Sequence, residues 1–335
     1  MVNSRSCEPV KLSLKTAPAA SAIFQQQLLS WYDAHARDLP WRASRDPYRI
    51  WLSEIMLQQT RVAAVIDHYH EFLRRFPTVQ KLAAAREASV LGAWSGLGYY
   101  RRARMLHAAA RAIVREHGGK FPSTEEGLRT LPGIGRYTAA AVASIAFSQP
   151  AAVVDGNVER VLQRILGKRM TAEELWAAAN HLLDANRPGD FNQAMMELGA
   201  VLCTPHAPAC LICPVAYLCA TRGEMPTRSP LAPQKRREIH YALACRPGKV
   251  FLLQRPRSAS LMPGMWELPE KLGANGAGIP SFTLRHSITV TDYTVKVWHA
   301  VTPPPQDGKW LSLRQLKQMP LTGLARKILR KAEML

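Results

Sequence analysis

Four of the chain's six cysteines lie in one short segment, in the pattern Cys203-x6-Cys210-x2-Cys213-x5-Cys219. Thiolates at such compact spacing can enclose either a tetrahedral zinc ion or an iron–sulfur cluster. Zinc sites usually combine two Cys-x2-Cys pairs, and here only Cys210 and Cys213 form one. The spacing therefore favours a cubane cluster in a single tight loop, with zinc as the alternative. Because no export signal is evident, clustered thiols indicate a metal site in a reducing compartment rather than disulfides.

Upstream of the cysteines the pattern is helical. Apolar residues recur at three- and four-residue spacing from residue 23 to about residue 220, which predicts about ten short helices and no strand. Residues 222–238 are rich in proline and arginine and predict an exposed linker. Beyond them, residues 239–255 indicate two strands around a Pro-Gly turn, and residues 283–301 alternate in the manner of strands. Residues 321–334 predict a final helix.

Composition bounds the class of protein. The chain has 335 residues, of which 47% are hydrophobic and 21% are charged, so we expect two or three folded domains rather than a disordered chain. No apolar run approaches the length of a membrane span, and the N-terminus has no apolar core of a secretory signal. The net charge of +19 makes a polyanion the first partner to consider.

Three segments carry candidate chemistry. LPGIG at 131–135 predicts a tight turn into a helix starting near Arg136, which is either a phosphate-binding hairpin or a plain corner. Asp155 opens a helix, so it is either an N-cap or a functional carboxylate. Glu54 sits among apolar residues, where it is either half-buried with a raised pKa or simply turned to solvent.

Together these segments resemble the helix-hairpin-helix, endonuclease III-like superfamily of base-excision glycosylases. Within it, SEIMLQQT around Glu54, GLGYYRRAR at 96–104 and FNQAMMELG at 191–199 are similar to the adenine DNA glycosylase (MutY) family. The resemblance covers residues 24–222 closely. It continues more weakly to the end of the chain, where GMWELP at 264–269 is similar to that family's Nudix-like domain.

The resemblance implies a multi-domain fold, in which an all-α helix-hairpin-helix core with an iron–sulfur loop precedes a small α+β Nudix-like domain. The expected parts are a flexible tail (1–22), a helical domain (23–222), a linker (223–238) and a lesion-recognition domain (239–335). Within the helical domain, a hairpin subdomain would span about 42–150, and a cluster subdomain would combine 23–41 with 151–222. The implied cofactor is a [4Fe-4S] cluster held by Cys203, Cys210, Cys213 and Cys219.

The implied reaction is excision of adenine mispaired with 8-oxoguanine or guanine, which leaves an abasic site. Glu54 matches the family's general acid, and Asp155 matches the anion that stabilises the oxocarbenium-like sugar, electrostatically or covalently. Bifunctional relatives carry a lysine where this chain has Tyr137, so the resemblance implies a monofunctional glycosylase. Tyr137 would assist near the sugar, and Asn157 would help to position Asp155 or the phosphate.

The resemblance also implies the contacts with double-stranded DNA. Gln59 and Tyr99 would enter the duplex where adenine leaves, and the hairpin backbone would hold phosphate. The full set of implied DNA contacts is Gln58, Gln59, Leu97, Tyr99, Gly133 and Gly135. The adenine pocket would be lined by Arg37, Leu39, Trp41 and Gln193, of which Leu39 and Trp41 are equally compatible with ordinary packing.

In the C-terminal part, Ser287 and Thr289 are the candidates for contacting 8-oxoguanine. The family often has a Phe-Ser-His loop there, whereas this chain reads Ile288-Thr289-Val290 after Ser287. The acidic Nudix signature is missing, so pyrophosphate hydrolysis is not expected. We expect a monomer in the cytoplasm, associated with the nucleoid if bacterial. The alternatives are an endonuclease III-like lyase, which Tyr137 disfavours, a non-catalytic lesion-binding protein, and a Nudix hydrolase with a helical appendage.

Overall fold

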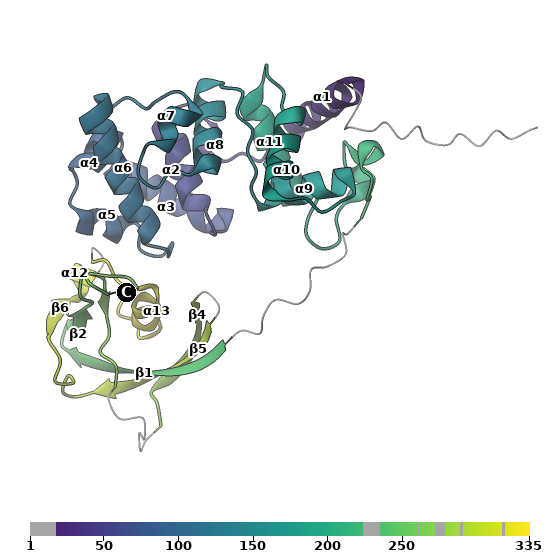
Figure 1. Ribbon diagram of the computed structural model, residues 1–335. Coiled ribbons are helices and arrows are strands. Elements are labelled where there is room, and N and C mark those ends of the chain that lie inside the picture. Colours follow the sequence, from purple (N-terminus) through teal and green to yellow (C-terminus); the bar gives the residue numbers. More distant parts are fainter. Residues whose placement is uncertain (1–17, 224–234, 260, 272–278, 289–290, 317–318) are drawn as a thin grey trace, which may run out of the picture. The chain divides into compact units, whose positions relative to one another are not determined.

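The computed structural model describes residues 18–335 apart from 224–234, 260, 272–278, 289–290 and 317–318. Residues 18–223 are all described and contain helices but no strand (Figure 1), as the apolar periodicity predicts. The helices are α1 (Pro18–His35), α2 (Pro47–Leu57), α3 (Val62–Arg75), α4 (Val79–Ala84), α5 (Glu87–Ala93), α6 (Arg101–His117), α7 (Glu125–Arg129), α8 (Arg136–Phe147), α9 (Gly156–Leu166), α10 (Ala172–Leu182) and α11 (Pro188–Val201), with 3-10 turns η1 (Pro40–Arg42), η2 (Cys210–Ile212) and η3 (Ala216–Leu218). The chain is already helical at Pro18, so the expected tail of residues 1–22 extends too far.

The chain forms two compact units. The first combines the described residues of 1–54 and 120–228, and the second combines 55–119 with the described residues of 229–335. The expected subdomain boundary near residue 150 is not a boundary between these units. The reason is that α8, which follows the hairpin, packs against α11 within the first unit.

Helix α11 is central to the first unit, where it packs against α1, α8 and α9. Two of its glycines permit this close packing. A Cβ atom on Gly189 would lie 2.7 Å from the Ser144 carbonyl oxygen, and one on Gly199 would lie 2.6 Å from Asn157 Cβ. Any side chain at either position would therefore force two helices apart.

The hairpin between α7 and α8 follows from its glycines. Gly133 has φ of 73°, in the left-handed region that favours glycine. Gly135 is the extended N-cap residue of α8, which starts at Arg136 as predicted. Small residues then line α8, and Thr138 to Ser144 are all buried.

The helices of the second unit are amphipathic. Helix α3 buries Val65, Tyr69 and Phe72 on one face, and the Phe72 ring meets the edge of the Trp94 ring at 6.0 Å between centroids. Helix α6 ends at His117, and the C-cap residue Gly118 adopts the left-handed conformation typical of a helix C-terminus.

The C-terminal part of the second unit contains a six-stranded sheet in the order β3-β2-β1-β5-β4, with β6 paired to β2. The strands are β1 (Lys235–Arg246), β2 (Lys249–Gln254), β3 (Trp266–Glu267), β4 (Phe282–Ile288), β5 (Thr291–Ala300) and β6 (Gly308–Ser312), and the helices are α12 (Leu313–Leu316) and α13 (Gly323–Lys331). The predicted hairpin around Pro247-Gly248 is the β1–β2 pair. Strand β1 begins within the expected linker of 223–238, so its first four residues belong to the sheet.

One hydrophobic core lies between this sheet and α13. Strand residues Leu243, Val250 and Val297 pack with Ile328 and Leu329 from the helix, and all five are fully buried. The predicted final helix is thus the element that covers the apolar face of the sheet. The short strands β3 and β6 extend the sheet on one side, and the sequence pattern did not predict them.

Replacing Gly189 with alanine is expected to destabilise the first unit by about 2 kcal/mol, because the new methyl group would clash with the α8 backbone. Urea unfolding followed by circular dichroism measures the change. Gly156→Ala is the matched control, since Gly156 also begins a helix but a Cβ there would meet nothing within 4 Å. Equal stabilities of the two variants would contradict the close packing of α8 and α11.

Candidate functional site

Glu54 and Tyr137 meet in the first unit. Glu54 lies on α2 and is 6% exposed, which confirms a buried carboxylate rather than one turned to solvent. The Tyr137 hydroxyl donates to Glu54 Oε2 at 2.8 Å and also lies 3.2 Å from Met196 Sδ. Tyr137 stands in the first turn of α8, directly after the hairpin. The hairpin therefore sets the position of the hydroxyl that faces Glu54.

Asp155 is the N-cap of α9. Its Oδ1 accepts hydrogen bonds from the backbone N–H groups of Asn157 and Val158 at 2.9 and 2.7 Å. Its Oδ2 accepts one from Asn157 Nδ2 at 3.1 Å. The capping role considered from the sequence is thus present, and it fixes the carboxylate beside the Glu54–Tyr137 pair, with which it interacts electrostatically.

The two carboxylates differ in their surroundings. Burial is the main cause that raises the pKa of Glu54 to about 7, the charge of Asp155 adds to it, and the Tyr137 hydroxyl and Arg42 oppose it. Burial also raises the pKa of Asp155, but three hydrogen bonds to its charged form and the charge of Arg160 act against that rise. The charged form of Asp155 is thus held by several N–H donors, whereas that of Glu54 accepts from the Tyr137 hydroxyl.

A chain of hydrogen bonds links Asp155 to the cysteine loop. Asn157 donates to Asp155, and its Oδ1 accepts from Arg160 Nη2 at 2.7 Å. Arg160 in turn donates to the carbonyl oxygens of Gly199 and Cys203, both at 2.7 Å. The Asp155 carboxylate is therefore supported by α11 and by the first cysteine of the loop.

Asn192 positions the segment that precedes Asp155. It is 2% exposed, and its amide donates to Ser144 Oγ and the Ala151 carbonyl while accepting from Val153 N–H at 3.1 Å. Every hydrogen bond of this buried amide ends on α8 or on residues 151–153. Asn192 therefore holds residues 151–153, which directly precede Asp155, against α8 and α11.

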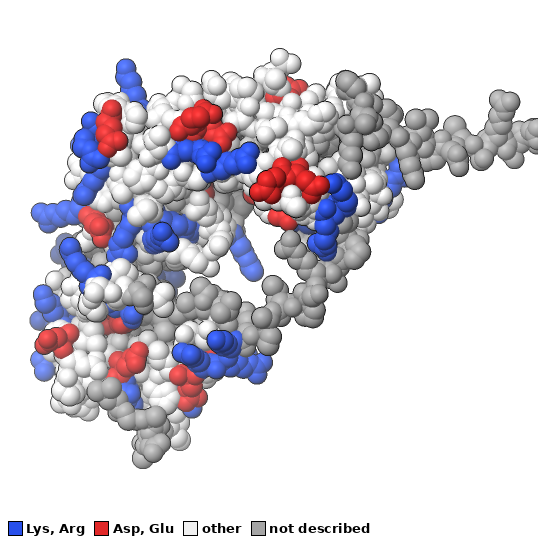
Figure 2. All heavy atoms as spheres, in the orientation of Figure 1, with Lys and Arg blue, Asp and Glu red and all other residues white. Residues whose placement is uncertain are grey.

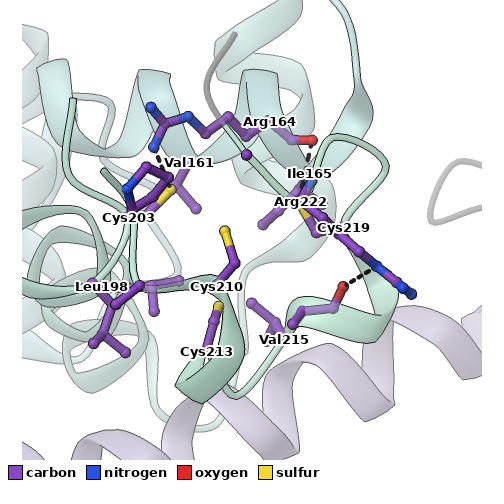
Figure 3. A pocket seen from close by; sticks show the side chains of 15 residues that line it. Val161, Arg164, Ile165, Leu198, Cys203, Cys210, Cys213, Val215, Cys219 and Arg222 are labelled. Carbon is purple, nitrogen blue, oxygen red and sulfur yellow. Dashed lines mark hydrogen bonds between the residues drawn. The ribbon is translucent and has the colours of Figure 1, made fainter. Parts of the chain in front are cut away.

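The four cysteines of the predicted metal loop surround one pocket (Figure 3). Its walls are apolar, with Val161, Ile165, Leu198 and Val215 among them. Arg164 Nη1 donates to Cys203 Sγ at 3.3 Å, and the backbone N–H of Arg222 donates to Cys219 Sγ at 3.4 Å. Burial raises the pKa of the Cys213 thiol to about 11, so a metal that binds there must displace its proton.

The four thiols around one pocket are donors of the kind that a metal cluster takes. Within the described part of the chain, no three His, Cys, Asp or Glu side chains converge closely enough to hold one metal ion. Cysteines that bind the corners of a cubane stand further apart than the four ligands of one zinc ion. Hydrogen bonds to sulfur, such as those from Arg164 and Arg222, also suit thiolate ligands of a cluster.

The four residues expected to line an adenine pocket have different surroundings in the structure. Leu39 and Trp41 are buried at 6% and 7% exposure. Arg37 forms an ion pair with the buried Glu197, which Arg42 also contacts. Burial raises the pKa of Glu197, but the hydrogen bonds from both arginines outweigh this and lower it to about 2. Gln193 lines a separate polar pocket of about 90 Å³ that also includes Arg42.

The expected DNA contacts occupy turns. Gln59 and Tyr99 are exposed and adopt positive φ values of 55° and 48°. Gln58 is half-buried, and its carbonyl accepts from Arg102. Leu97 is buried, whereas Gly133 and Gly135 expose the hairpin backbone.

Of the two candidates for 8-oxoguanine contact, only Ser287 is described, and it lies near the end of β4. Ser287 is exposed on β4, and its hydroxyl donates to Asp292 Oδ1 at 2.5 Å. Thr289 is outside the described residues. Elsewhere on the surface, Figure 2 shows acidic and basic side chains interspersed on the face drawn, so the net positive charge does not form one continuous basic area there. None of the described helices is long and apolar enough to cross a membrane.

The sequence interpretation missed several residues of the site: Asn192, Met196, Glu197, Arg160 and Arg164. Asn192, Met196 and Glu197 lie within the segment FNQAMMELG. An amide and a carboxylate among apolar residues of one helix were a signal by which Asn192 and Glu197 could have been found. Arg160 and Arg164 gave no such signal, because most of their partners are carbonyls and a thiol from segments distant in the sequence.

Residues 52–183 match the family described as HhH-GPD superfamily base excision DNA repair protein. A solved structure titled as a thermostable thymine-DNA glycosylase is 30% identical, with a TM-score of 0.58, and the alignment covers 61% of this chain and 97% of that one. The chain belongs to the HhH-GPD superfamily. The second unit's sheet lies outside the residues that match the superfamily.

Curated relatives confirm the predicted resemblance to adenine DNA glycosylases within the superfamily. The human protein of that name is 49% identical over 229 residues, which is 64% of this chain and 42% of the relative. The protein of that name from Arabidopsis thaliana is 39% identical over 313 residues, 78% of this chain and 49% of the relative. The chain thus spans less than half the length of either relative.

Replacing Glu54 with glutamine should stabilise the protein at high pH. The pKa of Glu54 is about 7 in the fold against 4.5 normally, so the stability of the wild type is fully present below the lower value and falls as pH rises through 7. Glutamine resembles the protonated acid and should add about 3.5 kcal/mol above pH 7, at roughly 1.4 kcal/mol per pKa unit. Urea unfolding at several pH values measures this difference.

Glu126→Gln is the control, because Glu126 is an exposed carboxylate on α7. Its stability relative to the wild type should not change in the same pH range. A Glu54→Gln advantage that is the same at low and high pH would show that Glu54 has an ordinary pKa.

Proposed function

We propose that this chain is a monofunctional DNA glycosylase that releases adenine paired with 8-oxoguanine or guanine and leaves an abasic site. The observation that carries the proposal is the buried Glu54 held by the Tyr137 hydroxyl beside the capped carboxylate Asp155. The adenine DNA glycosylases from human and Arabidopsis thaliana, which are 49% and 39% identical to this chain over the aligned residues, support the same reaction. Double-stranded DNA with such a mispair is the proposed partner, and the protein would act as a monomer.

In this proposal Glu54 is the proton donor. Adenine leaves poorly as an anion, so it departs with the electron pair of the glycosidic bond only when a ring nitrogen, N7, takes a proton. A pKa of about 7 lets Glu54 hold that proton near neutral pH and still give it up. The Glu54 carboxylate then accepts a proton from the water whose oxygen bonds to the anomeric carbon, which restores the acid.

Asp155 would stabilise the positive sugar left by adenine. Its fixed negative charge is available without rearrangement, since three hydrogen bonds hold the carboxylate. Tyr137 has a phenol rather than an amine, so it would not form a Schiff base with the sugar. This supports a hydrolytic reaction without strand cleavage.

The test is single-turnover adenine release from a duplex with adenine opposite 8-oxoguanine, with and without alkali. The wild type should release adenine, with strand breaks only after alkali and a rate that falls as pH rises through about 7. Asp155→Asn should slow release by about 10³-fold with unchanged duplex affinity, because asparagine still caps α9.

Asp184→Asn is the matched control. Asp184 also accepts two backbone N–H bonds, at 2.8 Å from Asn186 and Arg187, but it is half-buried in the turn before α11 rather than at the start of α9. It should retain wild-type release. Strand breaks without alkali would indicate a lyase of the endonuclease III kind, and good binding without release would indicate a lesion-binding protein.

We also propose that Cys203, Cys210, Cys213 and Cys219 hold a [4Fe-4S] cluster. The shared pocket, its apolar walls and the N–H donors to sulfur support this. When bound, the cluster would supply a covalent cross-link of residues 203–219. The second unit's sheet is proposed to be Nudix-like and to contact 8-oxoguanine through Ser287 and Thr289.

Protein purified without oxygen should therefore contain iron and absorb visible light, and Cys210→Ser should lose most of both, because one corner of the cluster loses its thiolate. Elemental analysis and absorption spectra measure these quantities. Cys245→Ser is the control, since Cys245 lies on β1 far along the chain from the loop. One zinc per chain and a colourless protein would refute the cluster.

A further inference from the structure

Arg102 holds two separate turns of the second unit. It lies in the first turn of α6 and is half-buried. Its guanidinium donates hydrogen bonds to five main-chain carbonyl oxygens and to the Thr60 hydroxyl. None of these acceptors is a carboxylate. The Arg102 guanidinium therefore holds the main chain of these turns in place and does not neutralise a carboxylate.

The first turn follows α2. Arg102 Nη1 donates to the carbonyl oxygens of Ile55 and Met56 at 2.8 and 3.0 Å, and also to that of Gln58. The last carbonyls of a helix have no partner within it, and a cation there is favourable. The next residue, Gln59, is exposed and held at φ of 55°.

The second turn precedes α6. Arg102 Nη2 donates to the carbonyl oxygens of Leu97 and Gly98 at 3.1 and 3.4 Å. The guanidinium also lies over the rings of Trp94 and Tyr99, at 5.5 and 5.4 Å from their centroids. Tyr99 is 51% exposed and has φ of 48°.

Both exposed side chains therefore start from strained backbone. A left-handed conformation of a residue other than glycine costs energy and persists only when its surroundings enforce it. Arg102 bonds to the carbonyls just before Gln59 and just before Tyr99, so one planar group sets both turns. Lysine could not do this, because a single ammonium lacks the two-nitrogen fork that reaches both turns.

We propose that Arg102 is a positioning residue that holds Gln59 and Tyr99 together as a preformed wedge for opening the base pair. This rests on the proposed function, since it assigns Arg102 to the step in which adenine leaves the duplex. Arg102 then acts through the two turns and touches neither adenine nor the sugar. Its contribution should be needed only where the target base starts out stacked and paired.

The test compares adenine release from two substrates under single-turnover conditions. One is a fully paired duplex with adenine opposite 8-oxoguanine, and the other has the same lesion inside a bubble of unpaired neighbours, where opening is already complete. Arg102→Lys should slow release from the paired duplex by about 30-fold but from the bubble by no more than about threefold. A general loss of folding would slow both equally, so equal losses overturn the proposal.

Arg111→Lys is the matched control. Arg111 lies on the same helix and also donates to backbone carbonyls, those of Ala83 and Ala85, away from both turns. It should release adenine from both substrates at nearly the wild-type rate. A paired-duplex loss as large as that of Arg102→Lys would overturn the assignment to Arg102.

Tyr99→Ala supplies an independent check, because an exposed side chain can be removed without unfolding the turn. It should show the same selective loss on the paired duplex, and adding Arg102→Lys should then slow release by less than about twofold. Multiplying losses, or a Tyr99→Ala loss that is equal on both substrates, would overturn the wedge. A wild type that releases adenine from neither substrate would instead refute the proposed function, and this inference with it.

Discussion

Three buried polar side chains organise the first unit, and each is matched by a partner from another segment of the chain. Glu54 meets Tyr137, Glu197 meets Arg37 and Arg42, and Asn192 binds Ser144 and residues 151–153. An unpaired buried group of this kind would be costly, so the helices are held at the one arrangement that satisfies them all.

The same contacts make the two carboxylates chemically different. Glu54 lies on a helix with apolar neighbours and has one hydroxyl donor, so burial dominates and raises its pKa. Asp155 stands at a helix N-terminus with N–H donors aimed at it, and these oppose the effect of burial. A proton donor and a charged stabiliser thus arise from similar side chains through local backbone geometry alone.

Sequence patterns predicted what depends on neighbours along the chain. Helical periodicity, the turn before Arg136 and the Pro247-Gly248 hairpin all follow from residues close in sequence. The burial of Glu54 was one of two interpretations that its apolar neighbours allowed, and the structure decides for it. Asp155 had two interpretations, a cap or a functional carboxylate, and the structure shows the cap in contact range of the site. Contacts between distant segments, such as Arg160 with Cys203 or Arg102 with Ile55, could not be predicted because arginine is usually exposed. Charged residues likewise concealed the start of β1 at Lys235.

The capping bonds of Asp155 have an entropic consequence. Both of its oxygens are bound within α9, so the side chain has one orientation as soon as the helix exists. The rotational freedom of this carboxylate is lost during folding rather than during substrate binding. A ligand that needs a negative charge at this point therefore finds it already oriented, and none of its binding energy goes into ordering the side chain.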